Sequence, residues 1–243
     1  MTVTKPKRHC SSRKGTLRAV PSNFSVERKQ GEALGDFAAR VLREGIRVGS
    51  LLPGEHLREA DVARWLNMSR TPVREAFHRL ASEGLLMTGP WNGAKVIELD
   101  QQRLVELYAV REALEGAAAR LAAQHASKAE IQNLFRIADS EKEARNNPAR
   151  LVLINAELHQ AIYSATHNRY LLQSLNGIAD TLGLLRHSTF VISGSAEQAH
   201  KEHLDILGAI RDRNPDKAEK AARIHVSNSL ALRLELLRRS VQQ

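Results

Sequence analysis

Residues 69–80 decide the fold of the N-terminal part of the chain, and they read SRTPVREAFHRL. Thr71 can cap a helix through its hydroxyl oxygen, and Pro72 suits a first helical turn because its missing N–H has no partner there. Apolar side chains recur at helical spacing and form one face, which consists of Val73, Phe77 and Leu80. The stretch therefore predicts an amphipathic helix that stops at Gly84.

The opposite face of this predicted helix carries hydrogen-bond donors. Arg70, Arg74 and His78 follow one another at intervals of four residues, so packing the apolar face inward directs all three to solvent together. The alternative is a solvated face on which Arg70 or Arg74 forms a salt bridge with Glu75 or Glu83. That alternative leaves the pattern of the neighbouring segments unexplained.

The segments on either side predict a small domain. Apolar residues recur at helical spacing from 34 to 46, and a second short helix is expected over roughly 58–66, closed by Asn67, which tolerates left-handed backbone geometry. Residues 85–87 and 94–97 favour two short strands joined by a loop that contains Asn92 and Gly93. Two helices, a tight turn and a hairpin are typical of a winged helix-turn-helix, which we assign to residues 28–98.

A winged helix-turn-helix can place its second helix in the major groove of DNA and its wing along a phosphate strand. Arginine suits this work because its planar fork donates two hydrogen bonds to the edge of guanine. Ser69 and Thr71, near the positive end of the helix, can bind phosphate oxygens, and Arg58 is placed for the DNA backbone or a base edge. The pattern therefore favours binding to double-stranded DNA.

A family resemblance points the same way. The runs PGEHLRE at 53–59, SRTPVREA at 69–76 and EGL at 83–85, with Val62-Ala63 and Arg79-Leu80, resemble the winged-helix domain of GntR-type bacterial regulators. The resemblance implies that a set of residues contacts operator DNA, namely Arg58, Ser69, Arg70, Thr71 and Arg74. It also implies that the wing tip, near Asn92 and Gly93, reaches the minor groove. Asn67 stands where the family usually has glycine.

From residue 100 onward the sequence predicts only helices. Amphipathic segments follow one another over 100–125, 128–145, 149–167, 169–190, 195–212 and 215–239. The breaks between them are marked by turn residues such as Asn147-Pro148 and Asn214-Pro215. We therefore expect a mainly α protein in which residues 99–243 form an all-α antiparallel bundle of six to seven helices.

Four potential metal ligands lie in this helical part. Asn155 and His159 are four residues apart and share a helix face, and His203 and His225 lie on two later helices. If those helices surround one cavity, three imidazoles and one oxygen suit a divalent ion such as Zn(II) or Ni(II). Spacing alone leaves open that these are surface or core histidines, since the chain contains ten.

A second resemblance favours the metal. VELYAVREALE at 105–115, residues 155–159, 202–203, 206–210 and 222–225 resemble the FCD effector domain of the FadR subgroup. It implies that Asn155, His159, His203 and His225 surround a metal, with a neutral Asn155 where many relatives have a carboxylate. Arg111 is then a candidate to bind a carboxylate effector, although an ion pair with Glu115 or a buried bridge is as good an interpretation. His187 and His200 are expected to take no part.

Composition sets the outer limits. The formal charge of +9 is compatible with a polyanionic partner. A single cysteine, Cys10, excludes an intrachain disulfide and fits the cytoplasm, and no apolar run approaches a membrane span. Residues 1–27 are basic and are expected to form a disordered arm.

The functional prediction is a ligand-responsive transcriptional regulator that binds an inverted-repeat operator as a homodimer, because one recognition helix reads few base pairs. The protein is not expected to be an enzyme. Two other classes are alternatives: a metal-dependent hydrolase with a basic localising domain, for which the sequence has no recognisable catalytic motif, and a nonspecific DNA-coating protein.

Overall fold

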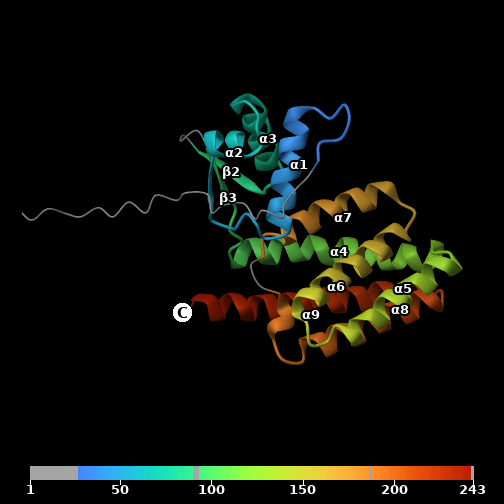
Figure 1. Cartoon of the computed structure of the whole chain (residues 1–243). Helices are drawn as coiled ribbons and strands as arrows, with labels where there is room; N and C mark the ends of the chain where they lie inside the picture. Colours follow the sequence, from blue (N-terminus) through green and yellow to red (C-terminus); the bar gives the residue numbers. More distant parts are fainter. Residues whose placement is uncertain (1–26, 90–92, 186–187, 242–243) are drawn as a thin grey trace, which may run out of the picture.

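The computed structural model describes residues 27–89, 93–185 and 188–241, and within them the protein is mainly helical (Figure 1). The N-terminal part contains three helices and a small sheet. Its elements are α1 (Leu34–Arg47), β1 (His56–Arg58), α2 (Glu59–Trp65), α3 (Arg70–Ser82), β2 (Leu86–Gly89) and β3 (Gly93–Val96). The winged helix-turn-helix predicted from the sequence is confirmed.

The turn between α2 and α3 spans residues 66–69, and Asn67 has a φ of 50°, the left-handed geometry expected of it. The predicted cap of α3 is wrong by two positions. Ser69 holds the cap position with extended backbone, whereas Thr71 lies inside the first turn together with Pro72. Thr71 is therefore an exposed residue of the first helical turn and does not cap the helix.

The sheet has three antiparallel strands in the order β1-β3-β2. β1 is too short for its alternation to reveal a strand in the sequence. Gly93, expected in the wing loop, is instead the first residue of β3, where it pairs with Arg58 and Gly89. A Cβ at Gly93 would lie 2.5 Å from the carbonyl oxygen of Leu57, so close strand packing requires glycine here. Asn92 and Trp91 fall outside the described residues.

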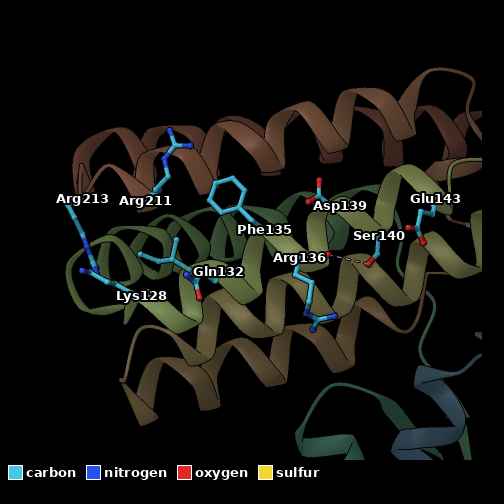
Figure 2. A pocket seen from close by; sticks show the side chains of 10 residues that line it. Lys128, Gln132, Phe135, Arg136, Asp139, Ser140, Glu143, Arg211 and Arg213 are labelled. Atoms are coloured by element: carbon cyan, nitrogen blue, oxygen red, sulfur yellow. Dashed lines mark hydrogen bonds between the residues drawn. The ribbon is translucent and has the colours of Figure 1, made fainter.

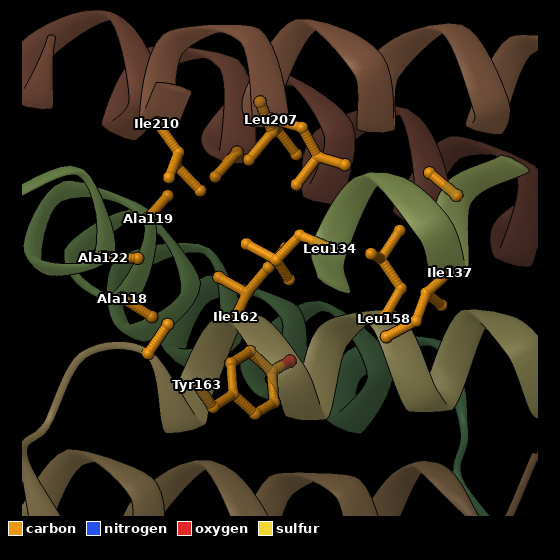
Figure 3. Packing of buried hydrophobic residues seen from close by; sticks show 14 of the residues in the cluster. Ala118, Ala119, Ala122, Leu134, Ile137, Leu158, Ile162, Tyr163, Leu207 and Ile210 are labelled. Atoms are coloured by element: carbon orange, nitrogen blue, oxygen red, sulfur yellow. The ribbon is translucent and has the colours of Figure 1, made fainter. Parts of the chain in front are cut away.

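The helical part consists of α4 (Gln101–His125), α5 (Lys128–Glu143), α6 (Pro148–Ser164), α7 (Arg169–Leu182), the 3-10 helix η1 (Thr189–Val191), α8 (Ser195–Arg211) and α9 (Pro215–Val241). The long helices α4 and α9 lie side by side (Figure 1). Figure 3 shows the core, in which a row of small side chains on α4 lets neighbouring helices approach closely. These side chains are Ala118, Ala119, Ala122 and Ala123.

One predicted helix boundary is wrong, because the helix expected over 169–190 ends at Leu182. Gly183 lies against α1, where a Cβ would come within 2.8 Å of the Cα of Arg47. The next residue, Leu184, leaves the helical domain and packs into the core of the winged helix, where it is 2% exposed. Contact between the two parts therefore redirects the chain at this point. His187 falls outside the described residues.

An ionic contact also links the two parts. Arg43 of α1 hydrogen-bonds to Glu83, and its Nε lies 3.3 Å from a carboxylate oxygen of Asp180 on α7. Burial raises the pKa of Asp180, and the attraction of Arg43 only partly offsets this effect. No helix in the described ranges combines the length and apolar character needed to cross a membrane.

Candidate functional site

The predicted DNA-reading residues lie on one open surface. Val73, Phe77 and Leu80 are buried beneath α3. The five predicted DNA-contact side chains at the end of β1, in the turn before α3 and on α3 are exposed, namely Arg58, Ser69, Arg70, Thr71 and Arg74. The inward packing of the apolar face thus carries Arg70 and Arg74 to solvent, as the spacing predicts.

Arg74 has a partner that the sequence did not suggest. Its Nε and Nη2 donate to the carboxylate of Glu59 on α2, at 3.0 and 2.8 Å. The two acidic residues considered as partners are not used in this way, since Glu83 accepts from Arg43 instead. Glu59 precedes Arg74 by fifteen residues, so helical spacing gives no hint of the pair.

The three predicted histidine ligands come together in the helical domain. His159 on α6, His203 on α8 and His225 on α9 are buried, and each offers a ligand atom within 4.8 Å of the others. Their ring centroids are separated by 5.5, 5.3 and 4.7 Å. The geometry supports the cluster that the sequence predicted.

Each imidazole is held from behind by a different carboxylate. The Nδ1 atoms of His159, His203 and His225 lie 3.0, 2.7 and 2.8 Å from carboxylate oxygens of three residues. These residues are Glu115, Glu141 and Glu202, respectively. A carboxylate that accepts from Nδ1–H fixes the tautomer and leaves Nε2 as the basic nitrogen.

The free nitrogens fit a metal ion. The Nε2 atoms of His159 and His203 are buried without a hydrogen-bond partner, which is costly unless something else satisfies them. Burial, assisted by the two neighbouring imidazoles, lowers the pKa of His225 to about 4 despite its hydrogen bond with Glu202. A neutral imidazole is the form that binds metal, so the three residues fit a divalent cation.

His200, expected to take no part, contacts the surroundings of this cluster. Its Nδ1 lies 2.7 Å from Glu141, whose other oxygen contacts His203. Burial opposes ionisation of Glu141, but the hydrogen bonds from His203 and His200 lower its pKa. Glu141 is thus an ionised acceptor shared by two imidazoles.

Arg111 is buried and forms an ion pair with Glu115, at 2.5 Å from Nε to Oε1. Burial opposes the charge, but the attraction of Glu115 outweighs it and raises the pKa of Arg111. The buried bridge that the sequence left open is therefore present. Arg111 also lines a cavity, so the ion pair does not remove it from the candidate site.

This cavity has a volume of about 1100 Å³ and is lined by residues of both parts of the protein. His159, His225 and Asn155 are among the residues of the helical part that line it. Five residues of the winged helix also line it, namely Arg47, Val48, Gly49, Leu52 and Pro53. A bound molecule in this space can contact both domains.

The sequence gave no sign of a second arginine in the cavity. Arg233 of α9 lines it together with Arg111 and Tyr108. Burial lowers the pKa of Arg233, and the charge of Arg111 lowers it further, while Tyr108 opposes the shift. These two arginines in the lining can bind an anionic group, while Glu157, Asp180 and Glu202 line other parts of the same cavity. Arg233 is one of many arginines on amphipathic helices, so no local pattern distinguishes it.

A second hollow, of about 930 Å³, lies on the outer face of α5 and α8 (Figure 2). Phe135 forms part of it, and Cζ of Arg211 lies 5.7 Å from the centroid of the Phe135 ring. Its lining contains no histidine, and it is separate from the histidine cluster. The inner cavity is therefore the candidate site.

The fold defines a winged-helix DNA-binding protein with a helical C-terminal domain that holds a buried histidine cluster. Residues 34–96 match the bacterial regulatory proteins of the gntR family, and residues 106–228 match the FCD domain. Since the FCD match covers half of the chain, this chain belongs to the GntR family of regulators with an FCD domain, the FadR type.

Relatives agree with this assignment. The Nta operon transcriptional regulator of Aminobacter aminovorans is 29% identical over 79% of this chain and 90% of its own length. The HTH-type transcriptional repressor RspR of Escherichia coli is 29% identical over 77% of this chain and 83% of its own length. These relatives are transcriptional regulators and not enzymes, as predicted for this chain.

A solved structure shows the same fold. E. coli McbR/YncC superimposes with a TM-score of 0.72 at 21% identity, over 84% of this chain and 99% of that one.

Proposed function

We propose that this chain is a ligand-responsive regulator that binds an inverted-repeat operator as a homodimer and senses a small organic acid through a metal. Residues 28–98 form the DNA-binding domain, residues 99–243 sense the ligand and form the dimer, and the protein acts in the cytoplasm. Arg58, Ser69, Arg70, Thr71 and Arg74 contact the operator, with Asn92 and Gly93 at the wing. A two-fold dimer matches a two-fold site, which gives the selectivity that one helix lacks.

His159, His203 and His225 hold a divalent ion, Zn(II) or Ni(II), with the side-chain oxygen of Asn155 as a fourth ligand. Such an ion supplies an electrophilic centre that binds an effector carboxylate directly. The orphaned Nε2 atoms of His159 and His203 support this assignment. Arg111 and Arg233 line the same space and attract the remaining negative charge of the ligand.

The observation that carries the proposal is the continuity of the cavity from the histidines to the winged helix. A ligand can change the affinity for DNA only if it favours one arrangement of the domains over another. Because residues of both domains line the same space, an occupant contacts both and can select their relative position. The acid therefore acts on the domain arrangement and does not need to touch DNA.

The sensor is tested by elemental analysis of the purified full chain, followed by melting curves with a panel of mono- and dicarboxylic acids. We expect one equivalent of metal per chain and a higher melting temperature with the cognate acid, since ligands that bind only the folded state stabilise it. Replacing His159, His203 and His225 by alanine should abolish both. A triple variant that keeps its metal refutes the site.

The DNA surface is tested by gel shifts with the DNA upstream of the protein's own gene and with random DNA. Arg74→Ala should abolish operator binding while leaving a folded dimer, whereas Arg239→Ala, at an exposed position on α9, should bind like wild type. Operator affinity close to wild type in Arg74→Ala would contradict the proposal.

A further inference from the structure

Arg74 presents only part of its guanidinium to the surface. Its side chain is 56% exposed, whereas that of its partner Glu59 is 8% exposed. Both oxygens of Glu59 are engaged, one by Nε and the other by Nη2. A nearly buried carboxylate on α2 therefore accepts two hydrogen bonds from one side of an exposed arginine on α3.

The ion pair with Glu59 leaves the end-on edge of the Arg74 guanidinium available for other hydrogen bonds. A guanidinium has five N–H groups in a fixed plane, and Glu59 accepts from the Nε edge. One hydrogen of Nη1 and the second hydrogen of Nη2 form the neighbouring, end-on edge. That edge has the spacing needed to donate to O6 and N7 of a guanine.

The surroundings of Glu59 keep it charged. The hydrogen bonds from Arg74 lower the pKa of Glu59 against the opposing effect of burial, and the charges of Arg70 and His78 lower it further. Glu59 thus lies near all three donors of the exposed face of α3. Its negative charge also reduces the general attraction of that face for phosphates.

We propose that Glu59 is a positioning residue that sets the base specificity of the protein by holding Arg74 end-on toward a guanine. This inference rests on the proposed role of Arg74 in reading the operator. An arginine held at a fixed angle loses little conformational freedom when it binds, and it rejects bases that lack two acceptors in line. Without Glu59, Arg74 swings freely and contacts phosphates or other bases.

The test uses the duplex that full-length wild-type protein enriches from a randomised DNA pool, and the same duplex with each base pair replaced in turn. Glu59→Gln keeps the size of the side chain but turns one acceptor into a donor facing Nη2. We expect discrimination at one guanine per half-site to fall about tenfold, the size of one bidentate contact. Affinity for random DNA should stay the same or rise, because one negative charge is removed.

Two further variants separate positioning from simple loss of structure. Asp61→Asn removes a charge from the same helix, where Asp61 pairs with the exposed Arg64, and should leave base preference unchanged. In an Arg74→Lys background, which keeps the positive charge but loses the planar fork, Glu59→Gln should cause no additional loss of preference, because it acts through the arginine.

The outcomes distinguish a failure of the proposed operator binding from a failure of the proposed role of Glu59. If wild-type protein enriches no sequence, the proposed operator binding fails. If it enriches a sequence and Glu59→Gln selects that sequence with undiminished preference at every position, the positioning role of Glu59 is wrong. A preference that Glu59→Gln lowers by the same factor in the Arg74→Lys background also overturns it.

Discussion

Arg111 and His159 share one carboxylate, that of Glu115. One oxygen of Glu115 lies 2.5 Å from Nε of Arg111, and the other lies 3.0 Å from Nδ1 of His159. All three side chains are buried. The candidate effector-binding arginine and a candidate metal ligand are therefore held by the same group.

Glu115→Gln should destabilise the protein by about 3–5 kcal/mol, because removing one partner leaves the buried charge of Arg111 uncompensated. Urea unfolding measures this loss. Glu112→Gln, on the exposed side of the same helix next to Arg223, should change the free energy of unfolding by less than about 0.5 kcal/mol. Equal effects of the two substitutions would mean that the buried pair contributes no special stability.

Glu141→Gln should weaken metal binding roughly 10- to 100-fold, since carboxylates behind a ligating histidine orient it and raise its basicity. Competition with a chromophoric chelator measures the affinity. Glu143→Gln serves as the control, because Glu143 lies on the same helix and is mostly exposed. Unchanged affinity in Glu141→Gln would exclude Glu141 from the support of His203.

Leu184→Ala should destabilise the winged helix by about 2–5 kcal/mol, the range for removing a buried leucine. The loss should appear in the DNA-binding domain although residue 184 belongs to the helical part, and hydrogen exchange of α1 and α3 locates it. Leu153→Ala, at a position 68% exposed, should have little effect. Protection lost mainly from α6 and α8 would contradict the packing described above.

Asp180→Asn should melt at or above the temperature of wild type at neutral pH. Because burial raises the pKa of Asp180, the folded state prefers the protonated form. The contribution of Asp180 to stability is thus most favourable below the ordinary aspartate range, and it is lost as the pH rises through the pKa of the folded state. Asparagine mimics the protonated form, and Arg43 keeps Glu83 as a partner.

The advantage of Asp180→Asn should shrink as the pH approaches about 4, where the unfolded carboxyl titrates. Asp139→Asn, at an exposed position on α5, provides the matched comparison. A melting temperature for Asp180→Asn well below that of wild type at neutral pH would show that the pair with Arg43 outweighs the cost of burial.

Local pattern predicted most of the fold. The period of Val73, Phe77 and Leu80 identified α3 and its exposed face, and Asn67 marked the turn before it. The predictions that were wrong or missing concern features set by contacts between segments distant in the sequence. The end of α7 is set by the approach of Gly183 to α1, and the strand β1 exists because β3 pairs with it.

The candidate site was predictable to the same degree. The histidines were predicted from the resemblance to the FCD domain, and the structure brings His159, His203 and His225 together. The carboxylates behind them were not predicted: Glu202 precedes His203 in sequence but contacts His225. Partners chosen by packing across helices leave no trace in local spacing.

The position of Leu184 in the core of the winged helix constrains the order of events during translation. The DNA-binding domain is synthesised first, yet one side chain of its core arrives only after most of the helical domain has left the ribosome. Domains usually fold as they emerge, but the core of this one stays incomplete until α7 and the residues just after it have been synthesised. A nascent chain interrupted at the end of α7, before Leu184, therefore has a winged helix that lacks one of its core side chains.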